Sequence, residues 1–287
     1  MDCDKCGRRA VIHQKYSGLH LCRQHFIADF ESKAKKSIRF SGGLPRGNHI
    51  AVAGFRGYRS IALMYFLAML TSKRRGITLS AIFVDDRISG HETTATEEEF
   101  AASLGFRCVR VSLCDEDKVV TRTTQDGSGD TGAGSDTLPD SLLERIAGGQ
   151  GITRVACDSN LDDEALSVLA AFLRGEPSRL IHPREASLFR IPRLYPFLHI
   201  PDREIALYAT LVSPETKTGY CPHRRDPFSE DVRDLLGVYS ARHPSTLHSL
   251  ANLGGRLRSI GVDRESGGSS GHRNGAVFSG DRIVNSG

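Results

Sequence analysis

The chain has 287 residues, of which 39% are apolar and 25% charged, with a formal net charge of +4. This composition is that of a globular protein with room for one large domain and smaller modules, and its basic balance favours a polyanionic partner. No apolar run reaches the roughly 20 residues that span a bilayer, and the first residues show no signal-peptide pattern, so we expect a cytoplasmic protein without a membrane partner. Three of the seven cysteines lie within the first 22 residues. That distribution indicates metal ligands and reduced thiols, not a disulfide framework.

The first predicted element is an N-terminal metal module. Cys3-x2-Cys6 is followed, fifteen residues later, by Cys22-x2-His25. Each pair has the spacing of a zinc hook, and two hooks supply the four nitrogen and sulfur ligands of a closed tetrahedral site. His20 is a competing ligand, but its spacing from Cys22 is poorer. We expect structural Zn²⁺ here, because so short a segment cannot bury a core of its own.

A basic amphipathic helix is predicted next. Its apolar stripe consists of Phe26, Phe30, Ala34 and Ile38. The basic side chains off this stripe are Lys33, Lys35, Lys36 and Arg39. We expect them to face the phosphate backbone of a nucleic acid, with binding that weakens steeply as salt rises. The metal module and this helix form the first predicted unit, residues 1–40, and a linker rich in glycine and proline follows.

The strand predicted over residues 48–53 runs into a turn typical of a phosphate site. The turn is Gly54-Phe55-Arg56-Gly57-Tyr58-Arg59-Ser60, and an apolar helix is predicted over 61–70. A glycine-bearing turn between a strand and a helix exposes backbone N–H groups at a helix N-terminus, which favours anions. Arginine is a bidentate phosphate donor, so Arg56 and Arg59 either grip an anion or are solvated side chains of a decayed loop.

Strands and helices then alternate along the chain. Strands are predicted over 77–84, 107–113 and 152–157, and helices over 92–104, 139–147 and 161–174. This alternation predicts an α/β fold with a parallel sheet and helices on both faces, in a unit spanning residues 48–200. The ligand site is expected at the carboxyl ends of the strands. Thr121–Thr137 has almost no apolar residue and is predicted to be a loop or a disordered insertion.

Two further units complete the predicted organisation. Residues 201–260 form a helical region, with helices over 201–211 and 228–236 and Pro201 at the first helical position. Residues 261–287 are rich in glycine, serine, asparagine and arginine and are predicted to be unstructured.

Several motifs carry a family resemblance when taken together. The metal hooks and the strand–turn unit ending at Ser60 are followed by Asn160-Leu161-Asp162-Asp163-Glu164, the most specific segment. Val84-Asp85-Asp86, Ile200-Pro201-Asp202 and Cys221-Pro222 add to the pattern. Over roughly residues 1–255 the chain resembles the tRNA 2-thiouridine synthetase family (TtuA type) of the PP-loop ATP pyrophosphatase superfamily. The resemblance implies a Rossmann-like PP-loop domain.

The resemblance also implies an activity, which is ATP-dependent sulfur transfer to a tRNA uridine. The uridine C2 oxygen is adenylated, pyrophosphate leaves, and sulfur then displaces AMP. The implied cofactors are ATP and Mg²⁺, and the implied partners are tRNA, a sulfur-carrier protein and a second identical or homologous chain. The residues implied to bind the nucleotide are Ala53, Gly54, Gly57, Arg59, Ser60, Asp85 and Asn160. Those implied to act in catalysis are Cys221, Asp162 and Asp163.

Three departures from the family pattern argue against a fully active enzyme. Ala53 and Arg59 stand where the family loop Ser-Gly-Gly-x-Asp-Ser has its first serine and its aspartate. The family's internal Cys-x-x-Cys pair, which would fall in Thr121–Thr137, is missing, so an iron–sulfur cluster is not expected. Cys114 and Cys157 are either substitutes for that pair or small buried hydrophobic residues. The cysteine-rich C-terminal ribbon of the family is also absent.

The sequence therefore leaves three functional hypotheses. The chain is a tRNA thiolation enzyme with a divergent loop, or a non-catalytic paralogue that binds tRNA or a partner, or an anion-sensing scaffold. Asp162, Asp163 and Glu164 have a second interpretation, as a negative first helical turn that complements the helix dipole. We expect weak or absent thiolation activity on a retained fold.

Overall fold

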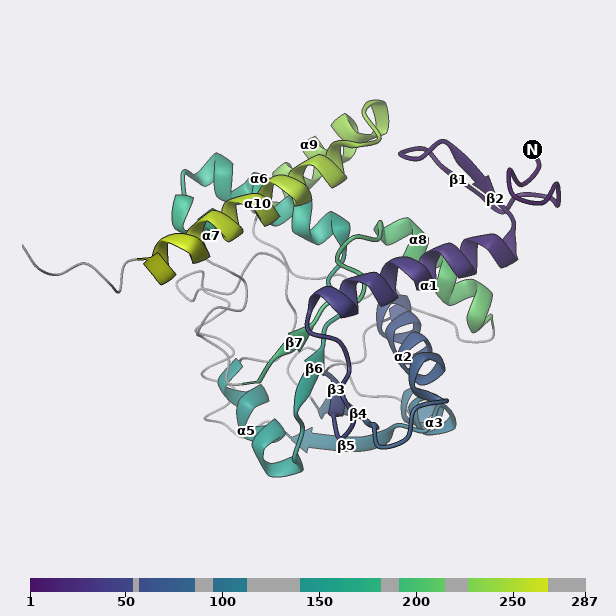
Figure 1. Cartoon of the computed structure of the whole chain (residues 1–287), viewed down its shortest axis with the longest axis vertical. Helices are drawn as coiled ribbons and strands as arrows, with labels where there is room; N and C mark the ends of the chain where they lie inside the picture. Colours follow the sequence, from purple (N-terminus) through teal and green to yellow (C-terminus); the bar gives the residue numbers. More distant parts are fainter. Residues whose placement is uncertain (54–56, 86–94, 113–139, 182–190, 215–226, 268–287) are drawn as a thin grey trace, which may run out of the picture.

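The computed structural model describes residues 1–53, 57–85, 95–112, 140–181, 191–214 and 227–267 (Figure 1). The N-terminal module pairs β1 (Ile12–Gln14) with the antiparallel β2 (Leu19–Leu21) and leads into the long α1 (Arg23–Phe40). The residues predicted as the apolar stripe of this helix are all buried. The helix therefore forms as predicted and covers the protein core with that stripe.

The central sheet is wholly parallel within the described residues, with strand order β5-β4-β3-β6-β7. Its strands are β3 (His49–Ala53), β4 (Thr78–Asp85), β5 (Arg107–Ser112), β6 (Arg154–Ala156) and β7 (Arg193–Leu194). The chain enters at β3, builds outward to β5, and returns to the opposite side of β3 at β6. A topological switch point therefore lies between β3 and β6, where doubly wound folds bind ligands at the carboxyl ends of the strands.

Alternate residues of β3 are buried on opposite faces of the sheet. Ile50 and Val52 belong to the core that includes α1 and α2 (Gly57–Thr71), whereas Ala51 belongs to a second core with Leu143 of α5 (Asp140–Gln150). The two-residue period of a strand sends neighbouring side chains to opposite faces, and a parallel sheet buries both. The predicted α/β fold with helices on both faces is confirmed.

The remaining helices lie along the outside of the sheet and in a C-terminal group. They are α3 (Ala95–Ser103), α6 (Leu161–Arg174), α7 (Pro177–Ile181), α8 (Asp202–Val212), α9 (Pro227–Arg242) and α10 (Thr246–Gly267). Several predicted boundaries differ, most of all the end of α9, which was predicted at residue 236, and two more concern α8 and α10. Pro201 is the N-cap of α8, in extended conformation, and not its first helical residue. Helix α10 continues past residue 260 because Asp, Arg and Glu precede the Gly/Ser-rich run, whereas residues 268–287 lie outside the described part.

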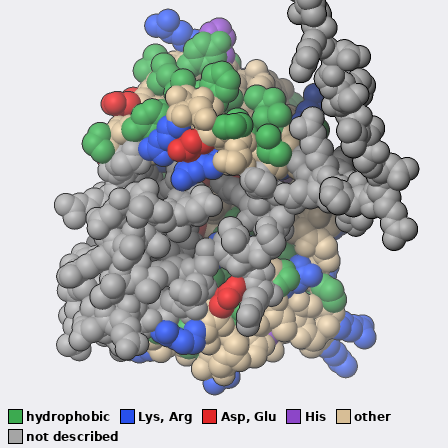
Figure 2. Space-filling model, turned by 90° about the vertical axis from the view of Figure 1, so that its left-hand side faces the viewer, with side chains coloured by type: hydrophobic (Ala, Val, Ile, Leu, Met, Phe, Trp, Pro, Cys, Tyr) green, Lys and Arg blue, Asp and Glu red, His purple; other side chains and the backbone are tan. Residues whose placement is uncertain are grey.

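The C-terminal helices expose several large apolar side chains. Figure 2 shows the face of the molecule that lies on the left in Figure 1, and hydrophobic side chains gather in its upper part, where these helices lie. The exposed ones are Phe172, Leu173, Leu235, Val238, Tyr239, Leu253 and Ile260. In the part of the chain that the structure describes, no helix is long and apolar enough to cross a membrane. Large exposed apolar side chains that gather on one face are suited to contact with another protein.

Candidate functional site

The four predicted metal ligands meet at one point of the N-terminal module. Their ligand atoms all lie within 4.8 Å of one another, with Cys3 Sγ 3.3 Å and Cys22 Sγ 3.6 Å from His25 Nδ1, and Cys6 Sγ 3.6 Å from Cys22 Sγ. Tetrahedral zinc needs such atoms roughly 3.5–3.8 Å apart. The set therefore fits zinc. The competing ligand His20 lies outside it and pairs with Asp4.

The surroundings of two cysteines favour the thiolate form. Burial raises the pKa of the Cys3 thiol, but hydrogen bonds from the backbone of Cys22 and Lys5 and from His25 lower this pKa to about 6. The pKa of Cys6 is lowered by hydrogen bonds from the backbone and the guanidinium of Arg8, whose Nε lies 3.4 Å from the sulfur. Because the thiolate is the metal-binding form, the site is prepared for a cation.

A second site lies at the switch point, where helix α2 begins earlier than predicted. Gly57 has a φ of +68°, a left-handed conformation that suits glycine, and it starts the helix. Arg59 and the buried Ser60 therefore lie in the first turn of α2 and not in a loop. The apolar pattern starts only at Ile61, which is why the polar first turn looks like loop in the sequence. Gly54 and Arg56 lie outside the described residues.

Arg59 joins α2 to two other helices at this point. Its Nε donates to Asp202 Oδ1 over 2.7 Å, and its Nη1 donates to Asp163 Oδ2 over 2.8 Å. Burial works to lower the pKa of Arg59, but the charges of Asp163, Asp202 and Asp158 raise it well above the ordinary value. The side chain is 15% exposed and stays charged. The guanidinium predicted to grip an anion is thus held by two carboxylates of the protein.

The predicted Asn160–Asp163 segment forms the start of α6. Asn160 Oδ1 accepts a hydrogen bond from Asp163 N at 3.0 Å, and Asp163 Oδ2 accepts one from Asn160 N at 3.3 Å, which makes a capping box. Asn160 Nδ2 also donates to Asp202 Oδ1 over 2.8 Å. The acidic residues lie in the first turn of α6, as the helix-dipole interpretation requires, and Asp163 also completes the cap. A catalytic role for Asp163 stays a prediction.

Asp162 joins α6 to the start of α8. Its Oδ2 accepts a hydrogen bond from the backbone N–H of Asp202 over 2.7 Å. Burial, with the charges of Asp202 and Asp163, raises the pKa of Asp162 against the opposing effect of that hydrogen bond. The N-termini of α2, α6 and α8 therefore converge at the carboxyl edge of the sheet, each contributing at least one side chain to a single polar cluster.

Two members of this cluster, Asp202 and Tyr58, were not predicted as site residues from the sequence. Asp202 accepts from Arg59, Asn160 and Tyr58, whose hydroxyl lies 2.5 Å from Asp202 Oδ2. The position of Asp202 directly after Pro201, at a helix start, was the available indication. Tyr58 had none, because an aromatic residue in a glycine-bearing turn has no characteristic partner.

The cluster does not fit Mg²⁺ as a centre of its own. Oxygens of Asp162, Asp163 and Asp202 already accept hydrogen bonds from Arg59, Asn160, Tyr58 or the backbone. In the described part of the chain, the N-terminal Cys₃His set is the one group of three or more Cys, His, Asp or Glu side chains arranged for a metal. Arg59 supplies the positive charge at the switch point instead.

The other predicted site residues are less informative. Ala53 ends β3 beside the cluster, and Asp85 ends β4 with a side chain outside the described part. Cys221, Cys114 and Thr121–Thr137 also lie outside the described residues. Cys157 is buried among apolar side chains, as its interpretation as a small hydrophobic residue requires.

The basic helix is only partly available to a ligand. Lys33 is bound internally to Asp29, and Lys35 pairs with Glu31 over 3.1 Å. Lys36 and Arg39 are exposed, and Lys36 Nζ lies 5.8 Å from the ring centre of Phe40, which is itself 77% exposed. Lys33 and Lys35 thus have carboxylate partners on their own helix, and the contact of this basic surface with tRNA stays a prediction.

Comparison with known proteins finds matches to the N-terminal module and to most of the chain. Residues 2–27 match the model of the N-terminal LIM domain of 2-thiouridine synthetase TtuA. The tRNA 2-thiolation protein NcsA of Haloferax volcanii is 31% identical over 273 residues, 87% of this chain and 84% of that protein. Mouse cytoplasmic tRNA 2-thiolation protein 1 is 28% identical over 89% of this chain and 64% of its own length.

A solved structure shares the fold. The U34-tRNA thiolase NcsA from Methanococcus maripaludis, determined with its [4Fe-4S] cluster, superposes with a TM-score of 0.71 at 23% identity. The match covers 90% of this chain and 87% of the other.

Proposed function

Because the chain belongs to the family of tRNA 2-thiolation proteins, we propose that it acts in ATP-dependent 2-thiolation of a tRNA uridine at the β3–β6 switch point. The observation that carries this proposal is the convergence of three helix N-termini on one polar cluster at that edge. Helix N-termini present unpaired N–H groups and partial positive charge, which favour the phosphates of a nucleotide. Gly57 and Ser60 of α2 and Asn160 of α6 would contact it.

The chemistry requires the C2 oxygen to attack the α-phosphate while pyrophosphate leaves. In this chain the backbone N–H groups at the start of α2 would hold the leaving anion, and ATP supplies the activation. The guanidinium of Arg59 keeps Asp163 and Asp202 neutralised, so that the phosphates do not approach unpaired carboxylates. Cys221 is the proposed sulfur-handling thiol.

A second candidate function is a non-catalytic subunit that binds tRNA or a partner protein. The two ion pairs of Arg59 favour it, because the Nε and Nη1 groups already bind carboxylates, which neutralise the guanidinium and would repel a phosphate. The exposed apolar side chains of α9 and α10 would then bind the partner, either a second copy or a homologue.

Thiolation of tRNA by the purified chain with ATP, Mg²⁺ and a sulfide donor distinguishes the two candidates. We expect 2-thiouridine and AMP in equal amounts, at about 10²-fold below the rate of the Haloferax relative, since one charged group of the loop is replaced. Cys221→Ser should abolish the product, with Cys108→Ser as the matched control. Absence of product, with tRNA binding retained, would establish the non-catalytic subunit.

We expect tRNA to bind at the C-terminal end of α1. Lys36 and Arg39 would contact phosphates, and the exposed ring of Phe40 offers a stacking surface for a base. Replacing Lys36 and Arg39 by alanine should lower the slope of log affinity against log salt by about 1–2. Lys35→Ala should leave it unchanged, because that lysine is paired with Glu31. Filter binding at several salt concentrations measures this, and equal slopes for all variants would refute it.

The Methanococcus relative was determined with a [4Fe-4S] cluster, which argues against the expectation that this chain has no such cluster. Cys108 lies near the start of β5 and Cys157 directly after β6, and these strands are three positions apart in the sheet, about 14 Å at ordinary strand spacing, so the two thiols cannot share one cluster. Once the three cysteines of the zinc set and Cys108 are set aside, three thiols remain for such a centre, those of Cys114, Cys157 and Cys221. We propose that the metal of this chain is the structural zinc alone.

A further inference from the structure

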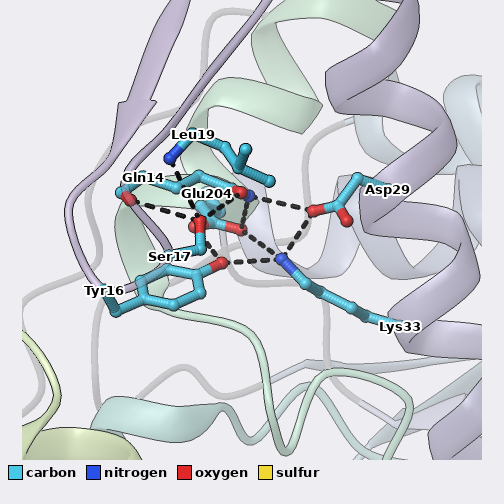
Figure 3. Close-up of polar contacts among 7 residues, drawn as sticks. All are labelled: Gln14, Tyr16, Ser17, Leu19, Asp29, Lys33 and Glu204. Atoms are coloured by element: carbon cyan, nitrogen blue, oxygen red, sulfur yellow. Dashed lines mark hydrogen bonds and ion pairs between the residues drawn. The ribbon is translucent and has the colours of Figure 1, made fainter. Parts of the chain in front are cut away.

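Helix α8 lies between the metal module and the nucleotide site. Its first residue, Asp202, binds Arg59 and Asn160 at the switch point. Its third residue, Glu204, points to the metal module instead (Figure 3). Residues two apart on a helix are about 200° apart around its axis, so one helical turn serves two sites on opposite sides.

Glu204 is fully buried against the module. Its Oε1 accepts from the Tyr16 hydroxyl over 2.8 Å, and its Oε2 accepts from Gln14 Nε2 over 3.1 Å and lies 3.6 Å from Lys33 Nζ. Burial raises the pKa of Glu204, while Lys33 and the Tyr16 hydroxyl oppose that rise. A buried carboxylate that loses its partners is strongly unfavourable, so α8 cannot shift away from these side chains freely.

A second carboxylate completes the network without touching α8. Asp29 of α1 accepts from Lys33 Nζ over 2.5 Å and from Gln14 Nε2 over 2.9 Å. It binds Gln14 and Lys33, as Glu204 does, but projects from α1, across the network from the hairpin (Figure 3). The chain thus supplies two acidic positions in one network, of which only Glu204 belongs to the helix that begins at the candidate site.

The rest of α8 is also attached to the module and α1. The rings of Tyr208 and Phe30 are stacked, with centroids 4.0 Å apart. At its end, Leu211 O accepts from Arg23 Nη2 over 2.9 Å, and Arg23 directly follows the metal ligand Cys22. Gln14 and Tyr16 lie in the hairpin between Cys6 and Cys22, so the metal restrains both ends of the segment that holds Glu204.

We propose that Glu204 is a positioning residue, through which the metal centre sets the geometry of the switch-point site. Metal at the cysteines orders the hairpin, the hairpin holds Glu204, and α8 then presents Asp202 to Arg59 and to the start of α6. Only the identity of the ligand, ATP or pyrophosphate, rests on the proposed function. Loss of either the metal or the Glu204 contacts should loosen the same distant residues.

Hydrogen exchange of the full chain, measured by mass spectrometry, tests this independently of any ligand. Removing the metal by chelation, or replacing Glu204→Gln, should speed exchange in segments 157–165 and 200–206, which contain the N–H groups of Asp163 and Asp202. Asp29→Asn is the matched control and should leave both segments protected. Tyr16→Phe, which removes a single hydroxyl, should act as Glu204→Gln does, only less.

Calorimetry with inorganic pyrophosphate and with ATP then measures the consequence. We expect about tenfold weaker binding for Glu204→Gln and for the chelated protein, and wild-type binding for Asp29→Asn. The proposal is wrong if Glu204→Gln exchanges like the wild type, or if Asp29→Asn has the same effect on both segments. Wild-type protein that binds neither ligand would refute the proposed function, while the exchange experiment would still decide the coupling.

Discussion

Replacing Arg59 by alanine is expected to lower the free energy of unfolding by about 3–5 kcal/mol. The substitution leaves Asp163 and Asp202 without their shared cation, and their side chains are only 12% and 30% exposed. An unpaired carboxylate in such a position retains its desolvation penalty and repels its neighbour. Urea unfolding followed by circular dichroism measures the loss.

Two further variants give this experiment its controls. Arg59→Lys should recover only part of the loss, because one ammonium cannot reproduce the two-way geometry of the guanidinium. Arg39→Ala removes an exposed arginine and should change stability by about 0.5 kcal/mol or less. If Arg59→Ala were as stable as Arg39→Ala, the ion pairs would be dispensable and the side chain would be available to a phosphate.

Stripping the metal is expected to unfold the N-terminal module. Zinc contributes apparent binding energies of about 10–16 kcal/mol in small zinc modules, and the β1–β2 hairpin has only three residues in each strand. Chelation or Cys22→Ser should therefore expose the hairpin to protease and lower the melting temperature. Cys108→Ser, a cysteine outside the set, should change neither.

Metal analysis of protein purified without oxygen completes the test. One zinc per chain and no stoichiometric iron is the expected result. About four irons per chain, with the absorbance of a cluster, would contradict the zinc-only proposal and make Cys114, Cys157 and Cys221 the ligands to examine. A chelated protein with an unchanged melting curve would contradict the structural role of the metal.

Local patterns in the sequence predicted much of the fold. Helix α6 has its predicted bounds because Asn160 caps its start and Gly175, in a left-handed conformation, ends it. The metal set was also predictable, since its ligands come from one short segment. Strand β7 was not, because two residues are too few to show an alternating pattern.

The candidate site was harder to predict because its contacts are distant in the sequence. Lys33 has the appearance of a solvated basic residue until Glu204, 171 positions later, is placed beside it. Arg59 likewise meets Asp202 across 143 positions, and no local pattern announces such a pair. The sequence shows which charged residues share one face of a helix, but not which of them form ion pairs with distant parts of the chain.

The long separation between Tyr16 and Glu204 also orders events during synthesis. All four metal ligands lie within the 23 residues from Cys3 to His25, so the module can take its metal as soon as this segment has left the ribosome. The carboxylate on which it docks lies 188 residues downstream of Tyr16 and follows after roughly 10–40 s at ordinary elongation rates. During that interval the nascent chain carries a metal module in which Gln14 and Tyr16 lack the carboxylate of Glu204 and Lys33 pairs with Asp29 alone. Final assembly of the protein therefore waits for α8, the helix that joins the metal module to the carboxyl edge of the sheet.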